Sequence, residues 1–328
     1  MLADVHLKSA GTTLETDAIE YFTYFLNKSN HAAGIPLDYV SYHWYGTANG
    51  HSVNKTSGQW VGWWLFEQAD AMLVQAAKLQ AIVNQLSPST KVNVDEIGSL
   101  YGCGDVLGAD RSYFNGVGAV YAYVYSELAE LGVEIMAASQ LVGYGYPSEY
   151  PRQIWPSPGM NSSQINGCVP GPGSPGCVNS PGALERNNFP CVTMLSWVDG
   201  SGTARFWTLK MMIDLLGGAD TRKSVVATTV RPAAATAAAG NSSSSIYAKG
   251  FAIRDATCSG ASCPTLRRVL LLVNKANVTG WATVSGAKGM NASKVDYTAG
   301  HGHIPYSTTA LDGDTFPMLG WAVHLLVM

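Results

Sequence analysis

The stretch Lys91-Val-Asn-Val-Asp-Glu-Ile-Gly-Ser-Leu-Tyr-Gly102 decides the fold prediction. Its first four residues form a short valine-rich run typical of a buried strand, and Gly98 and Gly102 are expected to break that strand. The carboxylate of Glu96 is therefore expected at the C-terminal tip of a strand. In parallel α/β folds this tip is where the chemistry takes place. On this stretch alone an ordinary loop-facing glutamate is an equal alternative, so the rest of the chain has to decide.

Strands and helices are predicted to alternate before and after this stretch. Apolar runs predict four strands, at 2–7, 35–46, 91–94 and 133–142. Apolar stripes at helical spacing predict one helix after each strand, at 14–26, 65–86, 110–128 and 203–216. Four such units predict a parallel sheet covered by helices and amount to half of a (β/α)₈ barrel. An open, doubly wound sheet is the alternative. No Gly-x-Gly-x-x-Gly or Walker-type loop follows any predicted strand, so we prefer the half barrel.

Two domains are expected. The first is an α/β domain over 1–218, with a long insertion rich in Pro, Gly and Cys at 145–191. From about residue 220 the pattern changes to short β-rich runs separated by turn residues, at 224–230, 246–253, 268–273, 282–284, 294–297 and 321–327. These runs predict an antiparallel β-sandwich domain over 219–328.

Composition limits the classes of partner. A chain of 328 residues that is 47% apolar can bury a large core, and its formal charge of −3 without a basic run argues against nucleic acid. No apolar stretch is long enough to cross a membrane. His301 and His303 are too few for a metal site, so neither a metal nor another cofactor is expected. The partner is expected to be a neutral molecule.

An extracellular or secretory location is expected, at a cell surface, in a matrix or in a lysosome-like compartment. Six Asn-x-Ser/Thr sequons give the density of a glycoprotein: Asn27, Asn54, Asn161, Asn241, Asn277 and Asn291. Six cysteines, mostly in loops rich in Gly, Ser and Pro, favour disulfides over metal or redox sites. Met1 opens directly on Leu-Ala-Asp-Val-His without the pattern of a leader peptide, which we interpret as a secreted protein that lacks its beginning.

Several motifs then carry a resemblance to a known clan of enzymes. These motifs are Ser-Tyr-His-Trp-Tyr at 41–45, Asp-Glu-Ile-Gly at 95–98, Ala-Ala-Ser-Gln-Leu-Val-Gly-Tyr at 137–144, Met-Leu-Ser-Trp at 194–197 and Ala-Arg-Phe-Trp-Thr-Leu-Lys at 204–210. They resemble strands six, seven and eight of the barrel in clan A glycoside hydrolases, with the nearest resemblance to families 39 and 79, the latter including heparanase-like enzymes. The segments 269–275 and 322–326 resemble the β-sandwich that follows the barrel there. The resemblance implies the C-terminal half of a (β/α)₈ barrel followed by a β-sandwich, and a carbohydrate partner.

The resemblance also implies roles for individual residues. Glu96 resembles the nucleophile of a retaining glycosidase, which needs a second carboxylate to protonate the leaving oxygen. His43 and Tyr45 end the sixth-strand position, where the clan places groups that bind the nucleophile or a sugar hydroxyl; a core histidine is the alternative for His43. Gln140 resembles an eighth-strand sugar contact. Trp197 is a candidate stacking platform or, equally, a core residue.

Strand alternation predicts the side on which the neighbours of Glu96 lie. Counting back from Glu96 by twos puts Val94 and Val92 toward the barrel interior with it, and leaves Asp95 facing the helices. Asp95 is therefore predicted to be a structural carboxylate. Trp60, Trp63 and Trp64 are candidates for lining a cleft, although packing is the more ordinary use of tryptophans at the start of a helix.

Three disulfides are predicted. Cys258 and Cys263 lie five residues apart between two β runs, where a hairpin brings their Cα atoms within bonding reach. Cys168 and Cys177 flank a Pro/Gly-rich segment that a local bond would fix. The remaining pair, Cys103 with Cys191, would lie on neighbouring loops at the C-terminal rim of a barrel.

The chain departs from the clan in one respect. The clan's general acid/base follows an asparagine at the end of strand four, and no Asn-Glu pair exists in this sequence. Three interpretations follow: the C-terminal part of a longer secreted glycosidase, a catalytically inactive glycosidase-derived structural or carbohydrate-binding glycoprotein, or a four-unit domain that pairs with a copy of itself. The first and third predict that a missing N-terminal segment or a second polypeptide completes the barrel.

Overall fold

The computed structural model describes residues 2–6, 16–32, 34–47, 63–100, 111–139, 141, 194–195, 200–218, 221–229, 245–258 and 263–328. Contacts divide the chain into two units, residues 1–108 with 124–193 and residues 109–123 with 194–328. Helix α6 (Ala204–Leu216) belongs to the second unit because it packs on strands of that unit, whereas the predicted boundary at 218 assigns it to the first domain. The boundary itself stays a prediction.

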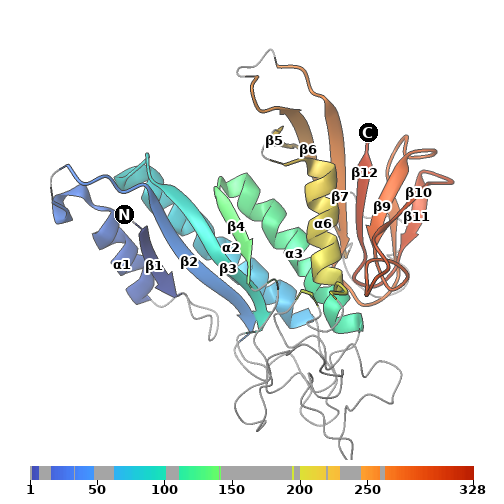
Figure 1. The fold of residues 1–328 in the computed structure, drawn as a ribbon, viewed down its shortest axis with the longest axis horizontal. Coiled ribbons are helices and arrows are strands. Elements are labelled where there is room, and N and C mark those ends of the chain that lie inside the picture. The colour runs from blue at the N-terminus through green and yellow to red at the C-terminus, as the bar shows by residue number, and fades with distance from the viewer. Residues whose placement is uncertain are drawn as a thin grey trace, which may run out of the picture. The chain divides into compact units, whose positions relative to one another are not determined.

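A four-stranded parallel sheet forms the centre of the first unit (Figure 1). Its strands are β1 (Leu2–His6), β2 (Tyr39–Thr47), β3 (Lys91–Leu100) and β4 (Ile135–Ala138), and they lie in the order β1-β2-β3-β4. The helices are α1 (Thr16–Leu26), the 3₁₀ turn η1 (Lys28–Asn30), α2 (Trp63–Leu86) and α3 (Arg111–Leu131), whose first part belongs to the second unit. The predicted alternation of strands and helices is confirmed from β1 to β4, whereas the helix predicted to complete the fourth unit is α6, which packs on strands of the second unit. A doubly wound sheet would reverse its strand order, and this sheet does not.

One face of the parallel sheet is its apolar face. Six side chains that alternate along β2 and β3 are almost completely buried: Val40, Tyr42, Trp44, Val92, Val94 and Ile97. Helix α2 packs against both strands and α1 packs against α2 (Figure 1). Burial raises the pKa of the Tyr42 hydroxyl above its ordinary value, because no solvent reaches it to stabilise the charged form. This face supplies the hydrophobic stabilisation, which leaves the opposite face of the sheet free to carry polar groups.

A β-bulge interrupts the alternation in β3. Tyr42 pairs with Val94, but the next pair is His43 with Glu96, so Asp95 is an extra residue. The pairing with β4 shifts in the same segment, between Val94 and Ile97. A bulge places two successive residues opposite one, which changes the side on which later residues lie. The prediction that Val94 shares a face with Glu96 is therefore wrong, and so is the predicted break at Gly98, because β3 continues to Leu100.

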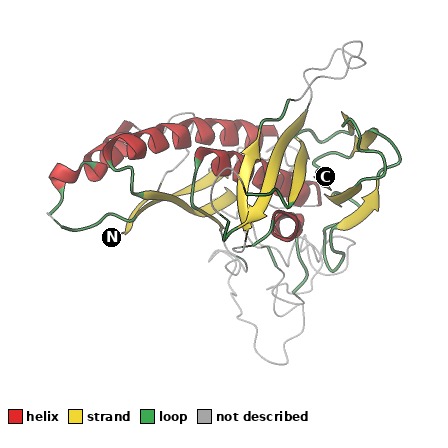
Figure 2. Cartoon of the chain, turned by 90° about the horizontal axis from the view of Figure 1, so that it is seen from above, coloured by secondary structure: helices red, strands yellow, loops and turns green. Residues whose placement is uncertain are grey.

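The second unit is mainly antiparallel β-structure, drawn as yellow arrows in Figure 2. Its larger sheet has six strands in the order β10-β9-β12-β7-β6-β5: β5 (Thr221–Val226), β6 (Ile246–Asp255), β7 (Arg267–Asn274), β9 (Asn291–Val295), β10 (Ser307–Ala310) and β12 (Val323–Val327). A two-stranded sheet pairs β8 (Gly280–Thr283) with β11 (Thr315–Met318). Strands β10 and β11 were not predicted, because β10 is short and exposed and β11 contains Pro317.

The two sheets of the second unit share one hydrophobic core. Large side chains of this core come from β7, β11 and β12: Leu272, Phe316, Met318 and Leu326. Cys258 and Cys263 are joined by a disulfide at the end of β6, with a Cα–Cα distance of 5.8 Å, which is the pairing predicted from the sequence. Among the described residues, no helix is long and apolar enough to cross a membrane, and no group of three or more His, Cys, Asp or Glu side chains is arranged to hold a metal ion.

Candidate active site

Polar side chains from three neighbouring strands meet on the face of the parallel sheet opposite its apolar face. His43 and Tyr45 come from β2, Glu96 from β3, and Ser139 directly follows β4. The strand register brings them together, because His43 pairs with Glu96 and Tyr45 pairs with Gly98. All of these residues belong to the first unit. The cluster thus depends on side chains separated by many residues in the sequence and adjacent in the sheet.

Tyr45 is the centre of the hydrogen bonding. Its hydroxyl donates to Oε2 of Glu96 and lies 2.8 Å from the hydroxyl oxygen of Ser139. Its ring occupies the space beside Gly98, where an added Cβ would lie 2.4 Å from two ring carbons. Only glycine at position 98 leaves room for the ring in this position. The sequence motif Asp-Glu-Ile-Gly therefore supplies both the carboxylate and the space for its hydrogen-bond donor.

His43 lies between two carboxylates. Its Nδ1 is 3.5 Å from Oε2 of Glu96, and its Nε2 is 3.4 Å from Oδ1 of Asp95. The imidazole is nearly buried, with 10% of its side chain exposed. The bulge at Asp95 makes this arrangement possible, because it brings consecutive carboxylates to the same ring. Asp95 was predicted to face the helices and to serve the structure alone; that orientation is wrong, since Asp95 lies beside the candidate site.

Glu96 is the most accessible carboxylate of the cluster. Its side chain is 42% exposed, and its contacts with Tyr45 and His43 both involve Oε2. None of the hydrogen bonds or ion pairs between Glu96 and the described residues uses Oε1. Hydrogen bonds to one oxygen fix the plane of a carboxylate and leave the other oxygen available for a reacting atom. The arrangement can therefore present a fixed, solvent-accessible carboxylate oxygen as a nucleophile.

The structure brings three of the predicted site residues together and leaves the others untested. His43, Tyr45 and Glu96 form the cluster, whereas Gln140 and Trp197 lie outside the described residues, as do Trp60 and the side chains of Trp63 and Trp64. Ser139 was missed as a separate site residue. The sequence offered one indication of its role, because Ser139 lies beside the candidate Gln140 within the predicted strand 133–142.

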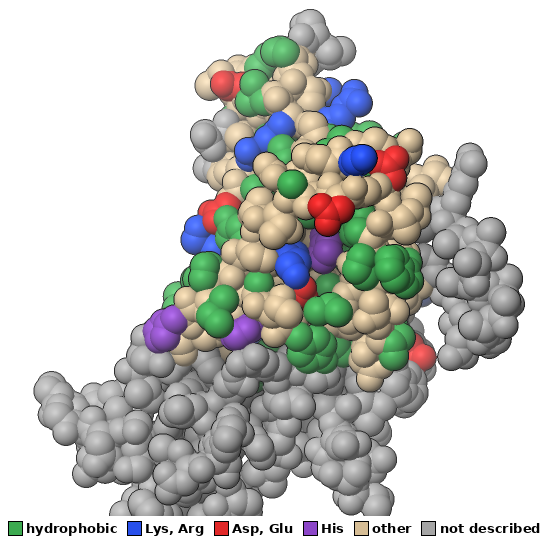
Figure 3. Space-filling view, turned by 90° about the vertical axis from the view of Figure 1, so that its right-hand side faces the viewer, with side chains coloured by type: hydrophobic (Ala, Val, Ile, Leu, Met, Phe, Trp, Pro, Cys, Tyr) green, Lys and Arg blue, Asp and Glu red, His purple; other side chains and the backbone are tan. Residues whose placement is uncertain are grey.

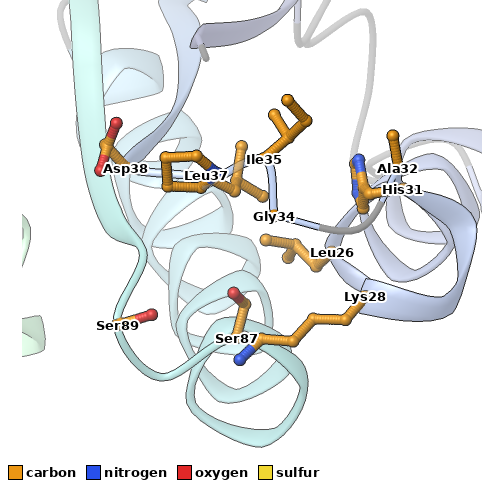
Figure 4. Close-up of a pocket in the computed structure, with 11 residues that line it drawn as sticks. Leu26, Lys28, His31, Ala32, Gly34, Ile35, Leu37, Asp38, Ser87 and Ser89 are labelled. Carbon is orange, nitrogen blue, oxygen red and sulfur yellow. The ribbon is translucent and has the colours of Figure 1, made fainter.

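A pocket lies at the other end of the same strands. It has a volume of about 430 Å³ and is lined by residues that include Leu26, Lys28, His31, Asp38 and Ser87. Figure 4 shows these side chains around the segments that precede β2 and β3. In parallel α/β barrels this amino-terminal side of the strands contributes to stability, and chemistry occurs at the carboxyl side. We therefore do not assign the candidate active site to this pocket.

The predicted surface modifications are tested only in part. Asn27, Asn277 and Asn291 are exposed, which glycosylation requires, and the other three sequons lie outside the described residues. The predicted pairs Cys103 with Cys191 and Cys168 with Cys177 also lie outside them.

Comparisons with known proteins add information about the fold. No family model matches the chain, and no curated protein shows detectable sequence similarity to it. The structure resembles that of a GH51 arabinofuranosidase from Xanthomonas axonopodis pv. citri, with a TM-score of 0.54 and 11% identity over 99% of this chain and 57% of that one. It also resembles a family 51 α-L-arabinofuranosidase from Bifidobacterium longum, with a TM-score of 0.53 and 12% identity over 100% of this chain and 58% of that one.

These similarities show that the chain shares its fold with part of each of the two arabinofuranosidases, at low sequence identity. The chain spans 57–58% of the length of the two arabinofuranosidases. Both are family 51 enzymes, so the finer resemblance to families 39 and 79 stays a proposal. A fold shared at this level of identity does not transfer an activity or a substrate, which have to be argued from the site.

Proposed function

We propose that this chain is the nucleophile-bearing part of a secreted retaining glycoside hydrolase, in which Glu96 attacks the anomeric carbon of a sugar. The observation that carries the proposal is the contact of one Glu96 oxygen with both Tyr45 and His43 while the carboxylate stays accessible. The fold similarity to glycoside hydrolases supports the same assignment. We also propose that the chain is nearest to families 39 and 79. The proposal includes its architecture, the C-terminal half of a (β/α)₈ barrel followed by a β-sandwich.

Each polar neighbour has a distinct task in the proposed reaction. Tyr45 and His43 hold Oε2, so that Oε1 forms the bond to the sugar and a covalent glycosyl-enzyme results when the aglycone leaves. Ser139, 2.8 Å from the Tyr45 hydroxyl, fixes the direction in which that hydroxyl donates. Asp95 orients His43 from its other nitrogen. Gln140 and Trp197 are proposed to contact the sugar.

The carboxylic acid that protonates the leaving oxygen has to come from outside the described cluster. The sequence lacks the Asn-Glu pair that carries this role in the clan, and the chain spans only part of the length of the enzymes it resembles. We propose that an N-terminal segment or a second polypeptide completes the barrel and supplies the acid. Strand β1 pairs only with β2 among the described residues, which leaves its other edge available for another strand.

Helix α1 supports the same proposal. Tyr24 and Tyr21 on this helix are 66% and 43% exposed, and Tyr21 stacks on Phe25 with ring centroids 5.8 Å apart. Neighbouring helices of a barrel pack against each other, so an exposed aromatic face beside the first strand fits a missing neighbour. The chain produced alone is expected to aggregate or to copurify with another polypeptide; a monomer that melts cooperatively at low concentration would contradict this.

A secretory location and glycosylation are part of the proposal. The disulfide between Cys258 and Cys263 and the exposed sequons at Asn27, Asn277 and Asn291 support an oxidising, extracellular or lysosome-like environment.

A catalytically inactive, glycosidase-derived carbohydrate-binding or structural glycoprotein is the second candidate function. The missing Asn-Glu pair favours it, because loss of the general acid/base typically lowers the rate about 10²–10⁴-fold. The two candidates differ in whether the native protein turns over any glycoside.

The deciding experiment uses the native protein purified from its source, tested on a panel of aryl glycosides that includes arabinofuranosides. If the native protein is active, Glu96→Gln is expected to abolish turnover without changing the melting temperature, since the substitution keeps the shape and removes the nucleophile. Glu67→Gln, the same substitution at an exposed position of α2, is the matched control and is expected to keep full activity. Activity of Glu96→Gln within tenfold of the unsubstituted protein would identify another nucleophile and refute the assignment.

A further inference from the structure

The two-stranded sheet of β8 and β11 has two faces of opposite character. Ala282, Phe316 and Met318 point into the hydrophobic core of the second unit. The other face consists of two cross-strand pairs, Trp281 with Pro317 and Thr283 with Thr315, and all four of these residues are exposed. We call this set of four residues the outer ribbon face. The core-facing side chains of the same two strands hold the outer ribbon face in place, so its shape does not depend on a ligand.

Trp281 dominates the outer ribbon face. It is 60% exposed, although tryptophan has more apolar area to bury than any other residue. Pro317, directly across from it, adds a second rigid apolar ring. One exposed hydrophobic side chain is ordinary on a protein surface. The combination of two rigid rings on a fixed sheet is a flat apolar platform.

Hydroxyl groups border this platform. The Oγ1 atoms of Thr283 and Thr315 lie 2.9 Å apart on the exposed surface. Only one of the two donates to the other, so the pair keeps one hydroxyl hydrogen and several lone pairs for a ligand. None of the four residues of the outer ribbon face is charged. The face therefore combines apolar rings with neutral hydrogen-bonding groups.

The loop before β8 is held in place by buried hydrogen bonds. Val278 in this loop is 63% exposed. The buried side-chain amide of Asn274 donates to the carbonyl oxygens of Val278 at 2.8 Å, Leu319 at 2.9 Å and Met318 at 3.1 Å. The loop is thus tied to the segment that follows β11. A surface that is rigid before binding loses less conformational entropy when a ligand binds.

From these features we propose that the outer ribbon face binds a neutral polysaccharide, with a sugar ring stacked on Trp281. A sugar ring presents C–H groups on its faces and hydroxyls at its edge, which match the apolar rings and the threonine hydroxyls. An anionic polysaccharide is disfavoured because the face carries no lysine or arginine. Figure 3 shows hydrophobic side chains in groups among uncharged atoms, with charged side chains of both signs between the groups. The outer ribbon face belongs to the second unit and Glu96 to the first, and the proposal does not depend on the proposed catalytic function.

The test measures depletion of the full chain, or of the native complex that contains it, from solution by microcrystalline cellulose and by insoluble xylan. The unsubstituted protein is expected to bind at least one of them, and Trp281→Ala to weaken that binding about tenfold or more, as expected for a central aromatic contact. Leu266→Ala is the matched control, because Leu266 is 61% exposed in the same unit and lies outside the outer ribbon face. Both variants are expected to keep the melting temperature, since the replaced side chains are largely exposed.

A further arm tests another source of binding. Thr279→Ala removes the sequon at Asn277, four residues before Trp281, and is expected to leave binding unchanged. Equal binding by Trp281→Ala, no binding to either polysaccharide, a preference for heparin, or binding that occurs only after Thr279→Ala would each overturn the proposal. The last of these results would mean that the chain's own glycan covers the face.

Discussion

Replacing Gly98 by alanine is expected to disrupt the candidate active site without touching any of its polar groups. The added Cβ would lie 2.4 Å from Cδ1 and Cε1 of Tyr45. Carbon atoms in ordinary contact lie about 3.5–4.0 Å apart, so the tyrosine ring has to move by about 1 Å or more. A movement of that size carries the Tyr45 hydroxyl away from Glu96 and from Ser139, to which it now lies at 2.8 Å.

The size of the effect follows from the contacts that are lost. A hydrogen bond to a charged group contributes about 1.5–3 kcal/mol, and overpacking a well-packed site costs about 1–3 kcal/mol. We therefore expect Gly98→Ala to lower the free energy of unfolding by about 2.5–6 kcal/mol. In the native enzyme, a displacement of about 1 Å at a reacting group is expected to lower kcat/KM about 10²-fold.

The assay compares three variants by thermal unfolding and by kcat/KM in the native protein. Tyr45→Phe removes the hydroxyl and keeps the ring, and Gly98→Ala is expected to reduce activity at least as much. The double variant is expected to be little worse than Gly98→Ala, because both changes remove the same hydrogen bond. Gly313→Ala is the matched control, since its added Cβ would meet nothing closer than 3.7 Å. Normal activity and stability of Gly98→Ala would refute the proposed role of Tyr45, and so would full additivity with Tyr45→Phe.

Three further predictions concern the stability of the second unit. Burial lowers the pKa of His324 to about 4 from an ordinary value of 6.5, so its stabilising contribution is complete above pH 6.5 and is lost as the pH falls toward 4. In urea unfolding, His324→Gln is expected to remove about 3 kcal/mol of this pH dependence. A pH dependence that is the same in His324→Gln and in the unsubstituted protein would contradict the prediction. Asn274→Asp is expected to lower the free energy of unfolding by about 3 kcal/mol or more, because a buried carboxylate would face three carbonyl oxygens. The same substitution at the exposed Asn291 is expected to change the melting temperature little. Equal effects of the two substitutions would rule out the proposed role of the Asn274 amide. Replacing Cys258 and Cys263 by serine is expected to cost about 2 kcal/mol, as closure of so short a loop implies; unchanged unfolding in the presence and absence of a reducing agent would show that the bond does not form.

The sequence predicts most of the elements that position the candidate site. The helix over 65–86 and the strands on each side of it follow from apolar periodicity, which is a local property of the chain. The structure forms α2 over Trp63–Leu86 and β3 from Lys91 onward, close to these expectations. Strand β11 was missed because Pro317 is unfavourable in a strand and only the pairing with β8 makes it one.

The individual site residues divide in the same way. Glu96 could be selected from the sequence because it is an acid at the end of an apolar run, whereas His43 and Tyr45 were selected through the resemblance to clan A glycoside hydrolases. The position of Asp95 could not, because strict alternation along β3 predicts the wrong face for it. The need for glycine at position 98 could not be predicted either, since it arises from the ring of Tyr45 on another strand.

The sequence by itself therefore determined the order of strands and helices in the first unit, the apolar faces of its helices and the choice of Glu96 as the candidate carboxylate. Local patterns suffice for these features because hydrophobic burial acts on each segment according to its own periodicity. Only the tertiary structure decided that Asp95 and Glu96 meet the same imidazole. The physical reason is the bulge in β3, whose register depends on hydrogen bonding to β2 and β4 at once and so is absent from any single segment.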